Sequence, residues 1–150
     1  MIYIGIDPAF RKNGIAICKI ENDKVNFYIA ESFIFFLQFI DAIDYKCTIA
    51  VENSNLQNVT FDMSGNKNII ARKSRNAGMN QAISQMICDF IKYKGLDLKE
   101  ISPAQKGKKL THVLTTLIAK NQKHDLINYK GLDSEQDKRD SYKLALMIKK

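Results

Sequence analysis

The chain opens with the stretch Ile2-Tyr3-Ile4-Gly5-Ile6-Asp7-Pro8, and a second apolar stretch, Gly14-Ile15-Ala16-Ile17-Cys18, follows it closely. The first stretch alternates as a buried β-strand does, with its three isoleucines on one face. Pro8 cannot continue the hydrogen-bond ladder of a strand, so this strand ends on the Asp7 carboxylate. A carboxylate at the end of a buried strand is costly to desolvate unless a cation compensates it. The stretch therefore predicts a core strand and a candidate metal ligand.

The hydrophobic pattern of the whole chain predicts how strands and helices alternate. We expect strands at 2–6, 14–20, 25–30, 48–52 and 96–101, and helices at 31–43, 75–94, 110–120 and 135–148. The polar stretch between about 53 and 73 is expected to be a functional loop, because it directly follows a strand that ends on an acid. This order predicts an α/β fold with a mixed five-stranded sheet flanked by helices, in one domain that spans residues 1–150.

Three further acids lie in positions similar to that of Asp7. Glu52 closes a predicted strand, and Asp137 and Asp140 are three residues apart on one face of the last helix. The apolar residues that pack this helix continue the same face, so both aspartates are expected to point toward the sheet. A second interpretation is a capping box beginning at Ser134, in which first-turn acids complement the helix dipole. That interpretation accounts for Asp137 better than for Asp140.

Four carboxylates at one place have a chemical consequence. They cannot all ionise within a few ångströms of one another unless a cation sits among them. Oxygen ligands without nearby His or Cys favour Mg²⁺ or Mn²⁺. We therefore expect Mg²⁺, with two ions per active site and Mn²⁺ able to substitute, held by Asp7, Glu52, Asp137 and Asp140. Two such ions suit hydrolysis of a phosphodiester.

The balance of charges points to a polyanionic partner. The chain carries 23 Lys and Arg against 16 Asp and Glu, a formal net charge of +7. This surplus favours nucleic acid, although lysines also serve solubility. Arg72, Lys73 and Arg75, with Asn76, are expected just before the long helix, where they would bind phosphates together with the free N–H groups of the helix start. The other candidates for binding DNA are Arg11, Lys12, Lys106 and Lys109.

These motifs together resemble a known family, the RuvC-type Holliday junction resolvases. The matching stretches are Gly5-Ile6-Asp7-Pro8 with Gly14-Ile15-Ala16, then Ala50-Val51-Glu52, then Ser102-Pro103-Ala104 before a lysine cluster, and Asp137-x-x-Asp140 leading into Leu144-Ala145-Leu146. They occur in order over essentially the whole chain. The resemblance implies a ribonuclease H-like fold and a homodimer that cuts four-way DNA junctions by paired nicks with Mg²⁺.

The resemblance also implies roles for single residues. A lysine after the Pro motif would assist catalysis; we take Lys108 as the candidate, although the spacing leaves Lys106 and Lys109 open. An aromatic residue in the loop after the glutamate would wedge into the junction, and Phe61 is the candidate. The chain departs from the family at its last motif, which is usually rich in small residues. Here Lys138-Arg139 and Ser141-Tyr142-Lys143 intervene.

The sequence thus predicts a Mg²⁺-dependent, structure-selective DNA endonuclease that resolves four-way or other branched junctions. One alternative is a non-catalytic junction-binding protein on the same fold. A nucleotide-binding phosphotransferase of the actin and sugar-kinase type is disfavoured, because the chain has only 7 Gly and no second Gly-rich phosphate loop. No apolar stretch approaches the roughly 20 residues of a membrane span, so we expect a cytoplasmic protein without a membrane partner. Cys18, Cys47 and Cys88 are expected to be reduced core thiols, and His124 to lie at the surface.

Overall fold

The computed structural model describes residues 1–9, 14–43, 46–57, 64–130 and 135–149. The strands are β1 (Ile2–Asp7), β2 (Ile15–Glu21), β3 (Lys24–Ala30), β4 (Cys47–Glu52), β5 (Asp97–Ile101) and β6 (Asp125–Ile127). The helices are α1 (Phe33–Asp41), the 3₁₀ turn η1 (Ser54–Leu56), α2 (Lys67–Tyr93), α3 (Pro103–Lys106), α4 (His112–Asn121) and α5 (Glu135–Ile148).

The strands form one mixed sheet in the order β5-β4-β1-β2-β3-β6. The pairs β1–β2 and β2–β3 are antiparallel, whereas β4 runs parallel to β1 and β5 parallel to β4. The predicted α/β class and mixed sheet are confirmed. The predicted number of five strands is wrong, because β6 adds a sixth strand parallel to β3. β6 has only three residues, too few for a period of two to be visible in the sequence.

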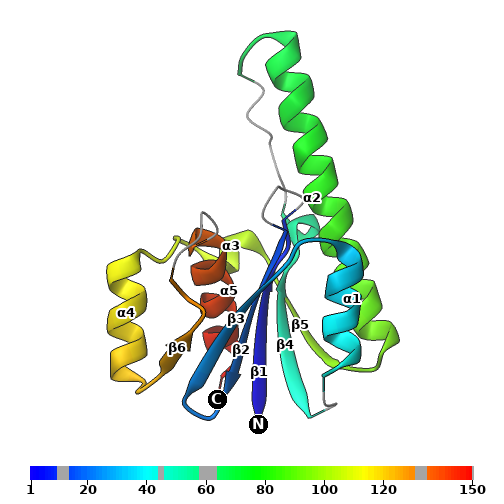
Figure 1. Ribbon diagram of the computed structural model, residues 1–150. Helices are drawn as coiled ribbons and strands as arrows, with labels where there is room; N and C mark the ends of the chain where they lie inside the picture. The colour runs from blue at the N-terminus through cyan, green and yellow to red at the C-terminus, as the bar shows by residue number, and fades with distance from the viewer. Residues whose placement is uncertain (10–13, 44–45, 58–63, 131–134, 150) are drawn as a thin grey trace.

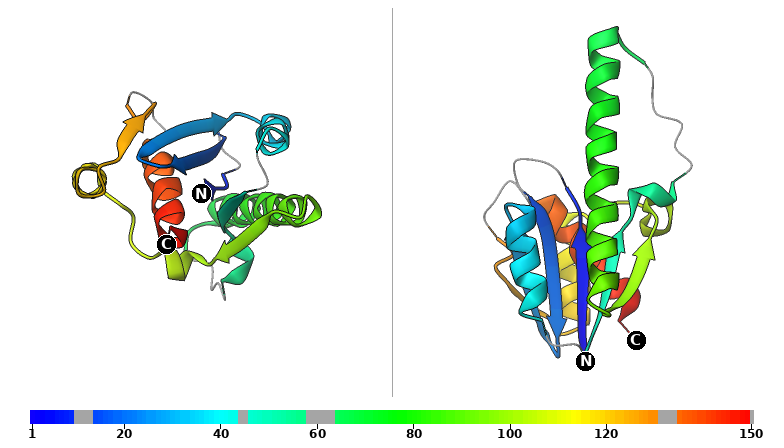
Figure 2. Two further views of the ribbon diagram at one scale, coloured as in Figure 1. Left: turned by 90° about the horizontal axis from the view of Figure 1, so that it is seen from below. Right: turned by 90° about the vertical axis from the view of Figure 1, so that its right-hand side faces the viewer.

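Helices cover both faces of the sheet (Figures 1 and 2). α1 and α2 cover one face, where Ile4 and Ile6 of β1 pack with Ile87 and Ile91 of α2. α5 covers the opposite face. The alternation predicted for β1 is confirmed, because its isoleucines share one core. The residues between them face α5, so the fold places Asp7 on the α5 side.

α5 lies unusually close to β1, and Gly5 makes this approach possible. A Cβ atom at Gly5 would overlap the backbone of Ser141 and Ala145. Both of these α5 residues are fully buried. Gly5 therefore brings the acids of α5 within reach of the acid at the end of β1.

The long helix differs from the prediction at its start. α2 begins at Lys67, where the Asn66 side chain accepts a hydrogen bond from the N–H of Ile69, and not at residue 75. The predicted loop is correspondingly shorter. Arg72 and Arg75 lie inside the helix, so the predicted cooperation with the free N–H groups of a helix start is wrong. Sequence periodicity missed these turns because nearly all of their side chains are exposed and show no apolar stripe.

Two predictions about core residues have opposite outcomes. All three cysteines are buried and none forms a disulfide, as expected. His124 is also buried, which contradicts its predicted surface position: its Nδ1 lies 2.7 Å from the Tyr142 hydroxyl. The hydroxyl group of a buried tyrosine needs a hydrogen-bond partner, and the imidazole of His124 is the partner here. None of the described helices combines the length and apolar character that crossing a bilayer requires.

Candidate active site

The site begins at the carboxyl ends of two parallel strands. β1 and β4 are neighbours in a register that pairs Ile6 with Val51. Asp7 and Glu52, the residues that follow this pair, therefore end their strands side by side. The Asp7 side chain is 13% exposed and that of Glu52 17%. The predicted gathering of strand-end acids rests on this parallel pairing, which the sheet supplies.

A lysine from the next strand connection enters between these acids. β5 runs into α3, whose start is fixed by a capping box between Ser102 and Gln105. Lys106 is the last residue of this helix and is buried. Its Nζ forms an ion pair with Glu52 and lies 3.8 Å from Oδ1 of Asp7.

α5 adds the third carboxylate, from the same face of the sheet as Asp7. Asp140 is only 3% exposed, and its Oδ2 lies 3.3 Å from Lys106 Nζ. Its second oxygen, Oδ1, accepts a hydrogen bond of 2.9 Å from Gln136. Asp137 is half-buried one turn earlier, and its charge acts on Asp7. Three carboxylates from β1, β4 and α5 thus surround one ammonium group; we call Asp7, Glu52, Asp140 and Lys106 the acid–lysine cluster.

The pKa values of Asp7 and Lys106 indicate that the acid–lysine cluster carries more acid groups than its one lysine can compensate. Burial raises the pKa of Asp7 to about 8; Lys106 opposes this rise, and the neighbouring carboxylates add to it. Burial also disfavours the charged form of Lys106, but Asp7, Glu52 and Asp140 together outweigh it, and the pKa of Lys106 lies above its usual value. The lysine is therefore charged at neutral pH. A single ammonium does not compensate the acids fully.

The carboxylate oxygens of the cluster are the type of ligand that a hard divalent cation prefers, although the ammonium group of Lys106 lies among them. Within the part of the chain that the structure describes, no group of three His, Cys, Asp or Glu is arranged to hold a metal ion. The carboxylates instead share Lys106. Glu52 Oε2 is buried and has, apart from this ion pair, no hydrogen-bond donor among the described residues. Such an oxygen, with the raised pKa of Asp7, fits a site that takes a further cation.

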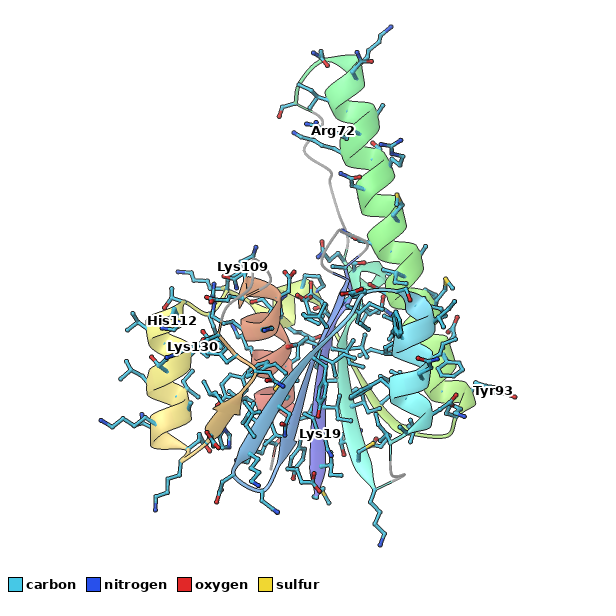
Figure 3. All side chains as sticks on the ribbon, in the orientation of Figure 1. Lys19, Arg72, Tyr93, Lys109, His112 and Lys130 are labelled. Carbon is cyan, nitrogen blue, oxygen red and sulfur yellow. The ribbon has the colours of Figure 1, made fainter. Side chains whose placement is uncertain are left out.

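Of the three candidate lysines, only Lys106 lies in the acid–lysine cluster. Lys108 and Lys109 are exposed, and the backbone carbonyl of Lys108 accepts a hydrogen bond from Lys143. Figure 3 shows Lys109 pointing to solvent near α3 and α5. Sequence spacing left the three open because a four-residue helix has too few positions to reveal which side is buried.

The remaining predicted residues lie away from the cluster or outside the described part of the chain. Arg72, Lys73, Arg75 and Asn76 are exposed on the first half of α2. This half projects beyond the sheet at the end where β1 and β4 finish (Figures 1 and 3). Arg11, Lys12 and Phe61 fall outside the described residues.

The structure also shows polar residues near the site that the sequence analysis did not single out. A cavity of about 240 Å³ opens beside Glu52 and Pro8 and reaches to α2. Its other walls include the amides and hydroxyls of Ser54, Gln57, Asn80, Gln81 and Ser84. The buried Ser84 interrupts the apolar stripe of α2, a signal that was available in the sequence.

Comparisons with known proteins support the fold. No protein-family model and no curated protein matches the chain. A solved structure, described as T. thermophilus RuvC in complex with Holliday junction substrate, is similar with a TM-score of 0.51 and 13% sequence identity. The match covers 97% of this chain and 90% of that one. At this identity the similarity establishes a distant RuvC-like fold of the ribonuclease H-like type.

Proposed function

We propose that this protein is a divalent-metal-dependent endonuclease that cuts four-way or other branched DNA. The observation that carries the proposal is the convergence of Asp7, Glu52 and Asp140 on one buried cation from three separate elements. The RuvC-like fold of a protein solved with a Holliday junction supports the class of substrate. The net charge of +7 supports a polyanion.

Each residue of the site has a role in this proposal. Asp7, Glu52, Asp140 and Asp137 would hold Mg²⁺ or Mn²⁺, with two ions in each site. Bound ions of this kind activate a water and stabilise the leaving oxygen of a phosphodiester. Lys106 pairs with the acids in the metal-free chain, and its ammonium would be available to the phosphate if the acids bound metal. This gives Lys106 the catalytic role for which the sequence offered three candidates.

The basic residues would position the substrate. Arg72, Lys73 and Arg75 project on α2 from the end of the sheet that carries the site, and Lys109 is exposed beside it. Such cations bind phosphates and convey no sequence. Paired nicks in opposed strands require two sites, so we propose that a second copy of the chain joins the first.

The decisive experiment compares labelled four-way junction, matched duplex and single-stranded DNA, each with Mg²⁺ or EDTA. We expect symmetric, Mg²⁺-dependent nicking of the junction. Asp7→Asn should lower its rate at least about 10³-fold, because one ligand of the cation is lost. Junction affinity in EDTA should persist.

The matched control is Asp89→Asn, which alters an exposed acid on α2 that is hydrogen-bonded by Gln85. It should cut as the unaltered protein does. Equal cutting of all three DNAs would contradict junction selectivity. Mg²⁺-dependent cutting that survives Asp7→Asn would contradict the proposed site.

One observation favours a second candidate, a junction-binding protein that does not cut. Lys106 already forms ion pairs with all three carboxylates, an arrangement that can serve the fold without a metal ion. In that case the junction would bind with equal affinity in EDTA, Mg²⁺ and Mn²⁺, and no DNA would be cut. The same assay therefore separates the two candidates.

A further inference from the structure

Three long polar side chains follow one another along α5 beside the acid–lysine cluster. Gln136, Arg139 and Lys143 are spaced by three and four residues, so they share a side of the helix. Arg139 and Lys143 belong to the stretch where the chain departs from the small residues that its resemblance implied. The sequence alone assigned no role to any of the three.

The first two of these side chains form a relay that ends on Asp140. Gln136 Nε2 donates to Asp140 Oδ1 at 2.9 Å, and Gln136 Oε1 accepts from Arg139 Nη2 at 2.9 Å. An amide has donors at one end and an acceptor at the other. Because the guanidinium takes the acceptor end, the donor end must face the carboxylate. Asp140 is thereby fixed with Oδ2 turned toward Lys106.

The same guanidinium also fastens the chain segment that follows Lys106. Arg139 Nε donates to the carbonyl of Leu110 at 3.0 Å, and one turn later Lys143 Nζ donates to the carbonyl of Lys108 at 2.5 Å. These carbonyls belong to the connector between α3 and α4. Gly107 begins this connector with a positive φ of 68°, so its backbone does not by itself continue the helix that carries Lys106.

Arg139 is buried, whereas a cation that binds DNA phosphates has to be exposed to solvent. Its side chain is only 13% exposed, and its nitrogens contact Leu110, Gln136 and Glu135. A guanidinium makes several hydrogen bonds in a fixed fork, which a lysine cannot do. Arg139 therefore links two parts of the site within the protein.

We propose that Gln136 and Arg139 are positioning residues that hold Asp140 and the Lys106 segment in one arrangement, which prepares the acids for a divalent cation. This inference rests on the proposed function, since it assigns the cation to the same carboxylates. Groups that orient metal ligands in this way typically change metal affinity or activity by about 10–100-fold when removed.

The test uses Arg139→Lys, Gln136→Leu and the double variant. Arg139→Lys keeps the positive charge but removes the guanidinium that bonds both Leu110 and Gln136. It therefore separates a positioning role of Arg139 from electrostatic attraction to DNA. Three quantities are measured: Mn²⁺ affinity of the free protein by calorimetry, junction affinity in EDTA, and kcat and KM for nicking. Lys120→Gln, an exposed lysine in the last turn of α4, is the control and should change none of them.

We expect each single variant to weaken Mn²⁺ binding about 10–100-fold and to lower kcat with little change in KM. The double variant should lose less Mn²⁺ affinity than the sum of the two single losses, because both residues act in part through Oδ1 of Asp140. Junction affinity in EDTA should stay unchanged. Unaltered Mn²⁺ affinity in both single variants, or additive losses in the double one, would overturn the proposal, even if the melting temperature falls.

Failure of the proposed function would be recognised separately, in the unaltered protein. If it neither binds Mn²⁺ nor nicks DNA, the nuclease assignment fails. The positioning role is then decided by a stability cycle in EDTA between Gln136→Leu and Asp140→Ala, each of which removes the hydrogen bond between the two side chains. Coupled changes in unfolding free energy support the relay, and additive changes overturn it.

Discussion

The acid–lysine cluster and the projecting half of α2 carry charge in opposite ways. In the acid–lysine cluster, three carboxyl groups that are buried or half-buried share one buried lysine. In the projecting half, residues 67–80, which we call the basic arm, the cations are exposed. No Asp or Glu occurs in the sequence between 64 and 88.

The difference separates charges whose positions packing fixes from charges that the fold leaves at the surface. Buried charges are tolerated only when other charges or hydrogen bonds meet them, so their positions are fixed by packing. Exposed cations need no such match, because water solvates them, and their charge can act on an external polyanion. A 27-residue helix is about 40 Å long, so the basic arm reaches well beyond the sheet. Three predictions probe this comparison.

The largest effect is expected when the cluster loses its lysine. Lys106→Met leaves the buried Asp7 and Asp140 and the half-buried Glu52 without their cation, and removing one partner of a buried ion pair costs about 3–5 kcal/mol. Urea unfolding in EDTA should show this loss, and added Mg²⁺ should restore more stability to the variant than to the unaltered protein. Lys108→Met changes an exposed side chain and should stay within about 0.5 kcal/mol. Equal effects of the two substitutions would mean that Lys106 does not compensate the acids.

A somewhat smaller effect is expected from the ionisation of Asp7. Its pKa is about 8 in the folded protein and 3.8 in the unfolded chain. Between these values the folded state retains a proton that the unfolded state has lost, so this group lowers stability as pH rises. Asp7→Asn removes the dependence. Relative to the variant, the metal-free protein should lose about 3–4 kcal/mol between pH 5 and pH 8.

The comparison requires urea unfolding of both proteins in EDTA at the two pH values. Asp89→Asn, with its acid exposed on α2, should differ from the unaltered protein by the same amount at both. A stability difference between Asp7→Asn and the unaltered protein that does not vary with pH would contradict the raised pKa of Asp7.

The smallest effect on stability is expected in the basic arm. Arg72→Gln and Arg75→Gln alter exposed side chains, so unfolding free energies should stay within about 0.5 kcal/mol. Junction affinity should fall, and the slope of log K against log salt should lessen by about 0.9 for each phosphate that the variant no longer neutralises. Lys120→Gln on α4 should leave the slope unaltered. If neither Arg72→Gln nor Arg75→Gln changes the slope of log K against log salt, these residues of the basic arm do not bind DNA phosphates.

Much of the fold could be predicted from the sequence because buried elements leave a periodic signal. The alternation of Ile2, Ile4 and Ile6 predicted β1 and its core face, and the apolar stripe of α5 predicted that helix from 135 to 148. The exposed start of α2 and the three-residue β6 left no such signal, and both were missed. His124 was misplaced because its partner, Tyr142, is distant in sequence.

The sequence by itself determined the types of residue at the strand ends and the surplus of positive charge. These are local properties, since a carboxylate that ends an apolar run is visible wherever the run lies. Only the tertiary structure decided that Lys106 rather than Lys108 or Lys109 meets the acids, and that Gln136 and Arg139 orient Asp140. Both outcomes depend on how closely α3 and α5 approach the sheet. That approach is set by packing between segments far apart in the chain, at places such as Gly5 against Ser141.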